Sequence, residues 1–116
     1  MAALDRATVK QGIIRDGQRY YPESRLLGSK KHGLDWAEGR ARAMRTHTPQ
    51  GQFGNLEDVM FAVERGAELG TDQSGIFSLP TGHHCTIYMP DGQLVEASQL
   101  FVKVYTDGKV HAYPML

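Results

Sequence analysis

Two short turns constrain the fold of this chain more than any other feature of its sequence. Pro90-Asp91-Gly92 and Thr106-Asp107-Gly108 each join two short runs in which apolar and polar residues alternate. Alternation with a period of two is typical of β-strands, and so short a connection can join only antiparallel neighbours. The C-terminal part therefore predicts an antiparallel meander of four or five short strands: IFSLP, CTIYM, QLVEA, LFVKVY and KVHAYP.

A helix is predicted before these strands, over residues 55–69. Its apolar residues recur along one helical face, at Leu56, Val59, Met60, Val63 and Ala67. Asn55, with Asp58 three residues later, resembles a capping box, and Gly70 is placed to end the helix.

The signals before residue 50 are weaker. Asp35 can cap a second helix, although Gly39 in its interior costs about 1 kcal/mol relative to alanine. The apolar positions of this helix are Trp36, Ala37, Ala41 and Met44, and Pro49 and Gly51 end it. Asp16-Gly17 predicts a short hairpin within GIIRDGQRYYP, and residues 22–31 are expected to form a loop.

A chain of 116 residues supports one core of ordinary size. Helices followed by strands predict an α+β fold, with N-terminal helices packed on one face of a four- to five-stranded antiparallel sheet. In LFVKVY the alternation divides the side chains between two faces: Leu100, Val102 and Val104 on one, Phe101, Lys103 and Tyr105 on the other. We expect the first face to pack against the helices and the second to be free to carry chemistry.

The composition excludes several classes of protein. With 41% hydrophobic and 22% charged residues, the chain fits neither disorder, nor a collagen-like repeat, nor a coiled coil. The single cysteine, Cys85, can form no internal disulfide, which favours a cytosolic environment. No apolar run approaches the roughly 20 residues of a membrane span, and the first residues lack the apolar stretch of a signal peptide. We expect no membrane span.

The net charge of zero is the sum of two unequal parts. Residues 1–45 carry ten Lys or Arg against five acids, a net charge of +5, whereas residues 46–116 carry three against eight, a net charge of −5. Such a division favours either a basic face for a polyanion or an attraction between the two parts of the chain. The sequence does not decide between them.

Histidine supplies the best candidates for catalysis, because the sequence has no phosphate-binding glycine loop, nucleophile elbow or paired-cysteine metal motif. One imidazole can accept a proton and another donate one near neutral pH. His47 lies between the two predicted helices in RTHTPQGQFGN, beside Arg45, which suits acid–base work next to an anion. Alternatively, His47 ends the preceding helix and interacts with its carbonyl groups.

His111 is the second candidate. It alternates with Val110 and Ala112 in KVHAYP, so it shares a sheet face with Lys109 and Tyr113. A cation, an imidazole and a phenol thus stand in a row, which is either a site or an ordinary solvated face.

The remaining histidines offer less. His83 and His84 are adjacent before a strand and point to opposite faces, so at most one can join a given site. A zinc site formed with Glu96 would have no standard spacing. We expect no metal and no cofactor, and Cys85 is expected to be a small buried apolar residue.

Two stretches carry a family resemblance: RTHTPQGQFGNLEDVMFAVERGAEL, and then FSLPTGHHCTIYMPDGQLVEASQLFVKVYTDGKVHAYP. They resemble the C-terminal toxin domains of bacterial polymorphic and contact-dependent growth inhibition systems, the small nucleases grouped with barnase, EndoU, the tRNase colicins and RelE. In many such domains a histidine precedes a loop that ends in Phe-Gly, then a helix and an antiparallel sheet. His47 and Phe53-Gly54 match this order. The resemblance covers residues 34–116, the nuclease-like domain, and leaves residues 1–33 as an N-terminal hairpin and linker segment.

The resemblance implies metal-independent cleavage of RNA, such as tRNA or rRNA, by attack of a ribose 2′-hydroxyl on the adjacent phosphodiester. This reaction needs a base, an acid and a cation. From this resemblance we assign His47 and His111 as the acid–base pair, although the sequence does not decide which is the base. Arg45 and Tyr113 are the other two residues assigned to catalysis. The residues expected to bind substrate are Lys103, Lys109, Thr86 and Arg42. It also implies a cognate immunity protein, delivery within a larger secreted protein, and action in the cytoplasm of a target cell.

Two other functions stay open. The eight acids after residue 46 and the lack of a strong catalytic motif favour a non-catalytic binding module, such as an immunity-like protein or an adaptor. A toxin that acts on a nucleotide or on NAD is the other. The neutral net charge is unusual for a toxin that cleaves RNA, although the basic part of the chain can still bind a polyanion.

Overall fold

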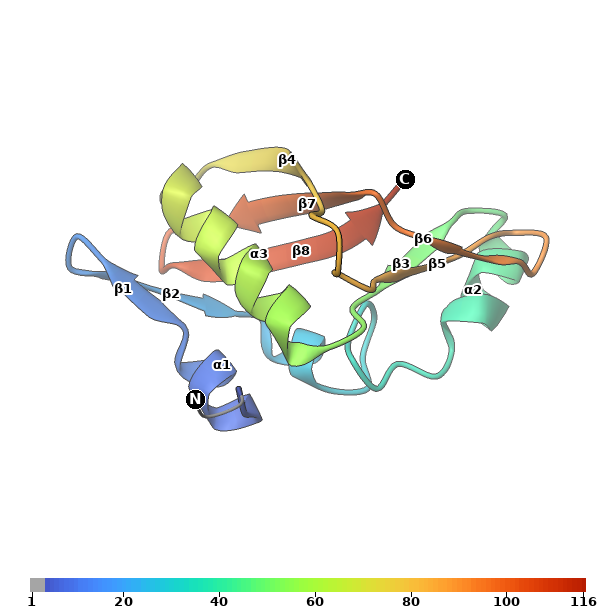
Figure 1. The fold of residues 1–116 in the computed structure, drawn as a ribbon, viewed down its shortest axis with the longest axis horizontal. Helices are drawn as coiled ribbons and strands as arrows, with labels where there is room; N and C mark the ends of the chain where they lie inside the picture. Colours follow the sequence, from blue (N-terminus) through green and yellow to red (C-terminus); the bar gives the residue numbers. More distant parts are fainter. Residues whose placement is uncertain (1–3) are drawn as a thin grey trace.

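Two β-sheets and three α-helices make up residues 4–116, the part of the chain that the computed structural model describes (Figure 1). The larger sheet has the strand order β1-β2-β8-β7-β4, and the smaller one β3-β5-β6. Their bounds are β1 Ile13–Arg15, β2 Gln18–Pro22, β3 Gln50–Gln52, β4 Ser74–Ser78, β5 Thr86–Tyr88, β6 Leu94–Glu96, β7 Gln99–Val104 and β8 Lys109–Met115. The helices are α1 Arg6–Gln11, α2 Gly39–Thr46 and α3 Leu56–Leu69, with a 3-10 turn, η1, at Ser24–Leu27. The predicted α+β class is confirmed.

The three predicted turns join antiparallel strands. β5 pairs with β6 across the turn at Asp91-Gly92, and β7 pairs with β8 across the turn at Asp107-Gly108; both pairs are antiparallel. β1 and β2 form the N-terminal hairpin. Its turn places Asp16 and Gly17 at φ values of 52° and 80°, the left-handed backbone that a two-residue hairpin turn requires.

The predicted helix over residues 55–69 is α3. The side chain of Asn55 accepts a hydrogen bond from the backbone N–H of Asp58 at 2.9 Å, and Gly70 ends the helix. Its buried face includes Val59 and Val63. Gly66 permits close packing on β8, because a Cβ at that position would lie 2.9 Å from a methyl group of Val110.

The second helix differs from its prediction. α2 begins at Gly39 rather than after Asp35, whose carboxylate pairs instead with Arg6. Gly39 allows a close approach, because a Cβ there would lie 2.6 Å from the ring of Tyr88 on β5. α2 contacts β3 and β5, so it lies against the smaller sheet, whereas α3 packs on the larger one.

The N-terminal segment is joined to the rest of the fold by a parallel pairing, the only one among the strands of residues 4–116. Tyr21 pairs with Lys109 of β8, and the backbone N–H of Glu23 continues the ladder to the carbonyl of Val110 at 2.9 Å. Val9 and Leu26 are completely buried in the main core. Residues 4–33 are therefore packed into the same body as the later strands.

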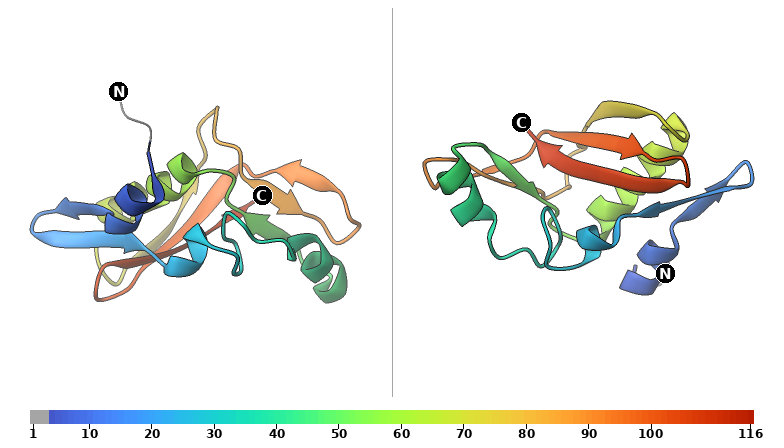
Figure 2. Two further views of the ribbon diagram at one scale, coloured as in Figure 1. Left: turned by 90° about the horizontal axis from the view of Figure 1, so that it is seen from below. Right: turned by 180° about the vertical axis from the view of Figure 1, so that it is seen from behind.

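The larger sheet has one covered face and one free face. Leu100, Val102 and Val104 of β7 are buried on the side of α3, as the alternation predicted. Phe101, Lys103 and Tyr105 lie on the opposite side, and the register of β7 with β8 places Lys109, His111 and Tyr113 there too. We call this side the open face; the right-hand view of Figure 2 is seen from its side, with α3 behind the sheet. None of the helices in residues 4–116 is long and apolar enough to cross a membrane.

Candidate functional site

A cleft of about 480 Å³ lies where the open face meets β3 and the segment between η1 and α2. His111 and Tyr113 of β8 line it, together with Arg25, Lys31 and His32 from the N-terminal segment. Gly51 of β3 also lines it. A Cβ on Gly51 would lie 2.1 Å from the carbonyl oxygen of Pro114, so glycine is what lets β3 approach β8 here. We call this site the His111 cleft.

His111 is held by a carboxylate. Its Nδ1 lies 2.7 Å from Oε2 of Glu23, and both side chains are largely buried. A carboxylate can only accept a hydrogen bond, so Nδ1 carries the proton and Nε2 is left for proton exchange. Such a pairing fixes the imidazole tautomer and stabilises the imidazolium when it forms.

His32 is the second imidazole of the cleft. Its Nδ1 donates to the carbonyl oxygen of Gly51 at 2.6 Å, which leaves Nε2 as the unprotonated nitrogen of the neutral ring. Burial lowers the pKa of His32 to about 4, and the positive charges of Lys31 and Arg25 act in the same direction. His32 is therefore neutral near pH 7 and carries a free lone pair on Nε2.

Two cations lie beside these imidazoles. Nε of Arg25 lies 3.2 Å from Oε2 of Glu23, the oxygen that also accepts from His111. The pKa of Lys31 is lowered, first by partial burial and then by the positive charges of Arg42 and Arg25. Mutual repulsion among cations is relieved when an anion binds between them, so the cleft is suited to a phosphate group.

Aromatic rings form one wall of the cleft. The ring of Tyr113 stacks on His32 with a centroid distance of 5.2 Å, and it lies 5.0 Å from the ring of Phe101. The phenol and the two imidazoles are thus fixed by packing, and the exposed edges of the rings offer an apolar surface for a base.

The structure brings only some of the residues predicted from the sequence to this cleft. His111 and Tyr113 line it. Lys103 is paired with His111 across β7 and β8, and the positive charge of Arg42 lowers the pKa of Lys31. His47 ends α2 in a left-handed conformation (φ 57°), and its backbone N–H bonds the carbonyl of Ala43.

The other predicted residues, like Lys103 and Arg42, are not among the residues that line the cleft. Neither His47 nor Arg45 is among the lining residues, although Thr48 is. Thr86 lies on β5, opposite Gln52 and Glu96. Lys109 lies at the start of β8, two positions before His111 on the open face. The pairing of His47 with His111 stays a prediction.

Sequence reasoning missed Glu23, Arg25, Lys31 and His32 as members of the site. All four belong to the segment that the family resemblance does not cover. The pairing of β2 with β8 brings Glu23 to a residue 88 positions away, and no local pattern announces such a pairing. The one available signal was the sequence KKHG, in which a histidine follows two lysines.

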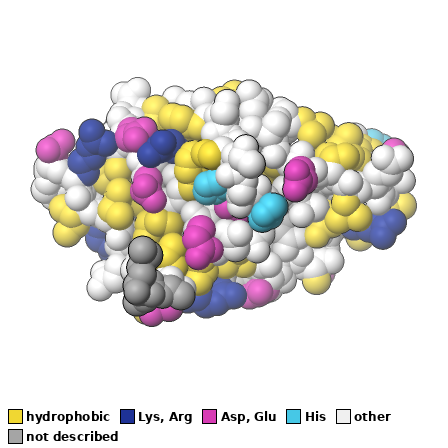
Figure 3. All heavy atoms as spheres, viewed as in Figure 1, with side chains coloured by type: hydrophobic (Ala, Val, Ile, Leu, Met, Phe, Trp, Pro, Cys, Tyr) yellow, Lys and Arg dark blue, Asp and Glu magenta, His cyan; other side chains and the backbone are white. Residues whose placement is uncertain are grey.

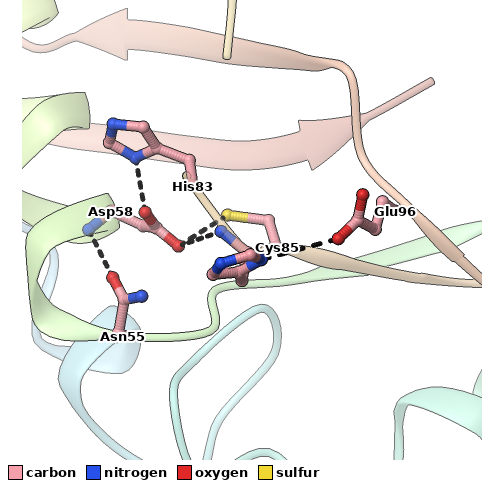
Figure 4. Close-up of polar contacts among 6 residues, drawn as sticks. Asn55, Asp58, His83, Cys85 and Glu96 are labelled. Carbon is pink, nitrogen blue, oxygen red and sulfur yellow. Dashed lines mark hydrogen bonds and ion pairs between the residues drawn. The ribbon is translucent and has the colours of Figure 1, made fainter. Parts of the chain in front are cut away.

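A second cluster of titratable groups surrounds Asp58 on α3 (Figure 4). The carboxylate of Asp58 is 1% exposed and accepts three hydrogen bonds, from Nδ1 of His83 at 2.5 Å, the backbone N–H of His84 at 3.3 Å and Sγ of Cys85 at 3.3 Å. These bonds attach the segment before β5 to the first turn of α3. We interpret this cluster as structural, because its carboxylate is fully occupied by groups of the protein.

The same cluster offers no nucleophile and no metal site. Burial raises the pKa of the Cys85 thiol far above its ordinary value, and the neighbouring Asp58 charge adds to this effect. Nδ1 of His84 lies 3.5 Å from the carboxylate of Glu96, and both side chains are well exposed. Within residues 4–116, no three His, Cys, Asp or Glu side chains are grouped so that they could hold a metal ion.

No protein-family model, curated protein or solved structure matches this chain. The resemblance to nuclease toxins therefore stays a prediction, and the functional argument depends on the His111 cleft.

Proposed function

We propose that this protein is a toxin domain that cleaves single-stranded RNA without a metal ion, and that the His111 cleft is its active site. One observation carries the proposal: two imidazoles, His32 and His111, line a single cleft with Arg25 and Lys31, and each is held through Nδ1 so that Nε2 is left for proton exchange. General acid–base cleavage of a phosphodiester needs a base, an acid and a cation, and these residues supply all three.

The reaction begins at the ribose 2′-hydroxyl. His32 Nε2 takes the proton of this hydroxyl, and the 2′-oxygen attacks the adjacent phosphorus. The bond from phosphorus to the 5′-oxygen of the next nucleotide then breaks, and the imidazolium of His111 gives its proton to that oxygen. The products are a 2′,3′-cyclic phosphate and a free 5′-hydroxyl.

The roles of the two rings follow from their surroundings in the cleft. His32 donates to a carbonyl group and has a pKa of about 4, so it is unprotonated at neutral pH and the lone pair of its Nε2 is free. His111 donates through Nδ1 to the carboxylate of Glu23, which fixes the ring and leaves Nε2 to deliver a proton to the leaving oxygen. This assignment replaces His47 by His32 as the partner of His111.

Arg25 and Lys31 stabilise the negative charge that develops on the phosphorane oxygens. The contact with Glu23 occupies Nε of Arg25, and the terminal nitrogens of its guanidinium remain available to a phosphate. Tyr113 adds a phenolic hydroxyl, and Lys103 and Lys109 extend the positive charge along the open face.

The proposal includes the biological context implied by the family resemblance. A cognate immunity protein would cover the cationic cleft with acidic side chains and so block access of RNA. The domain would be delivered within a larger protein and would act in the cytoplasm of the target cell.

The test is incubation of purified protein with labelled tRNA and rRNA in excess EDTA, followed by analysis of the product ends. We expect cleavage, with 2′,3′-cyclic phosphate and 5′-hydroxyl termini. Products with 5′-phosphate ends, or cleavage only after addition of a divalent metal, would contradict the mechanism. A parallel incubation with NAD tests whether the substrate is instead a dinucleotide cofactor.

His47→Ala separates the two assignments of the second imidazole. Since His47 is exposed and does not line the cleft, this variant should cleave RNA at close to the wild-type rate. His32→Asn should lose most of the activity. The opposite result, loss in His47→Ala and retention in His32→Asn, would restore the pairing predicted from the sequence.

A further inference from the structure

A second groove, of about 380 Å³, lies between α1 and β2. Its lining includes Arg6, Lys10, Arg19, Tyr21, Ser24 and Leu27. We propose that this groove binds the sugar-phosphate backbone of single-stranded RNA, on the same strand that occupies the His111 cleft. The inference rests on the proposed ribonuclease function for the nature of its ligand.

The groove carries positive charge that the fold does not neutralise. Arg6 pairs with Asp35, with its Nη2 3.0 Å from Oδ2. Within residues 4–116, neither Lys10 nor Arg19 forms an ion pair with a carboxylate, and both are exposed. Asp107 touches the lining only through the hydroxyl of Tyr21, which donates to its carboxylate at 2.7 Å.

Arg19 is already held in position before a ligand binds. Its Nε donates to the carbonyl of Gln11 at 2.7 Å, and its Nη2 to the carbonyl of Lys10 at 2.9 Å. The guanidinium lies 4.4 Å from the centre of the Tyr21 ring. Other N–H groups of the guanidinium remain for a phosphate, and little side-chain entropy is lost when one binds.

The groove and the His111 cleft are connected along the open face. Tyr21 is the direct partner of Lys109 in the pairing of β2 with β8, and Lys109 lies two residues before His111 on the same face. From strand spacing and rise, Tyr21 and His111 are roughly 8 Å apart along the sheet. Lys109 also lies 5.4 Å from the centre of the Tyr105 ring, so cations and aromatic rings alternate along this path.

The alternation of cations and aromatic rings favours single-stranded nucleic acid over other anions. Proteins that bind single strands combine a cationic track for the phosphates with aromatic rings that contact the bases or sugars. On the opposite face, the one that carries α3, acidic side chains are interspersed with Lys and Arg (Figure 3). The path across Lys109 thus explains how a chain with zero net charge can bind RNA.

The test measures the affinity for 2′-O-methyl oligonucleotides, which lack the 2′-hydroxyl and cannot be cleaved. Fluorescence anisotropy compares a trinucleotide, which is long enough to fill the His111 cleft, with a nonanucleotide, which is long enough to fill the cleft and extend along the whole groove. At about 0.1 M salt, loss of one phosphate contact predicts roughly fivefold weaker binding of the nonanucleotide and a salt slope smaller by about 0.7. Lys10→Ala should show both changes and should bind the trinucleotide like the wild type.

Arg40→Ala is the matched control, because it removes one exposed cation from α2, beside the smaller sheet. It should leave binding of both oligonucleotides unchanged. The double variant Lys10→Ala/Arg19→Gln should bind the nonanucleotide roughly 25-fold more weakly, and its circular dichroism melt reports whether α1 is intact.

The outcomes distinguish this inference from the proposed function. If Lys10→Ala binds the nonanucleotide as tightly as the wild type, or if the wild type binds no oligonucleotide, the groove proposal is wrong, whatever the result of the cleavage assay. If the groove variants bind the nonanucleotide more weakly but the wild type does not cleave RNA in EDTA, the groove is an RNA-binding site and the proposed catalysis is wrong.

Discussion

Asp58 allows the most direct calculation of a stability effect. Its carboxylate is buried and accepts hydrogen bonds from the ring of His83, the backbone of His84 and the thiol of Cys85. In Asp58→Ala all three donors lose their acceptor at once. The segment before β5 then loses its attachment to the first turn of α3.

The magnitude follows from the burial and from the number of bonds. A hydrogen bond to a buried charged group contributes about 1.5–3 kcal/mol, and the backbone and thiol donors are left without a partner in a site that excludes water. The ring of His83 is partly exposed and can bond to water instead, so the other two bonds, at about 1.5 kcal/mol each, lead us to expect a loss of about 3 kcal/mol in the free energy of unfolding. A domain of 116 residues unfolds with an entropy of about 0.24 kcal/mol per degree, so the melting temperature should fall by about 12 °C.

The assay is thermal and urea unfolding followed by circular dichroism. Glu57→Ala is the matched control, because Glu57 lies in the same first turn of α3 and is exposed. It removes an acidic side chain near the same helix end, which contributes at most about 1 kcal/mol. If Asp58→Ala lowers the melting temperature no more than Glu57→Ala does, the interpretation of this cluster as a structural anchor is wrong.

Three further predictions concern the His111 cleft. Nitrogen-15 NMR should show His32 as the Nδ1–H tautomer with a pKa of about 4. Because His32 binds a proton more readily in the unfolded chain, the free energy of unfolding of the wild type, relative to His32→Asn, should fall as the pH drops from about 6.5 to about 4. Titration of His32 near 6.5 would contradict its burial. Glu23→Gln should lower kcat for RNA cleavage roughly 100-fold with little change in KM, because Nδ1 of His111 loses its carboxylate partner, and an unchanged kcat would remove Glu23 from the mechanism. Gly51→Ala should destabilise the protein by about 1–3 kcal/mol in urea unfolding, since its Cβ would overlap the carbonyl of Pro114, whereas Gly28→Ala, with 3.9 Å to its nearest neighbour, should be close to neutral.

Local signals in the sequence predicted much of the fold. The capping residues and apolar face of α3, the three turns that contain Asp-Gly, and the alternation of β7 are all short-range patterns, and each leads to the expected element. The start of α2 was predicted too early in the chain. Asp35 is a residue type that often caps helices, but in the folded protein its carboxylate pairs with Arg6. A tertiary ion pair of this kind leaves no periodic trace in the sequence.

The site was harder to predict, for a related reason. His111 and Tyr113 were found because they alternate on one strand, and the structure places both in the cleft. Glu23 and His32 come from the segment that was expected to be a linker, and they reach the cleft through the parallel pairing of β2 with β8 and through the bond to Gly51. Contacts over such separations depend on the complete fold, so residue types alone do not reveal them.

The central claim is that His111 exchanges a proton with RNA. The most direct measurement compares initial rates of RNA cleavage in EDTA for His111→Ala and His84→Ala, which remove imidazoles from the cleft and from an exposed position outside it. His84→Ala should keep the wild-type rate, and His111→Ala should be at least about 100-fold slower at a temperature at which its circular dichroism spectrum shows that it is folded. Equal rates for the two variants would contradict the central claim.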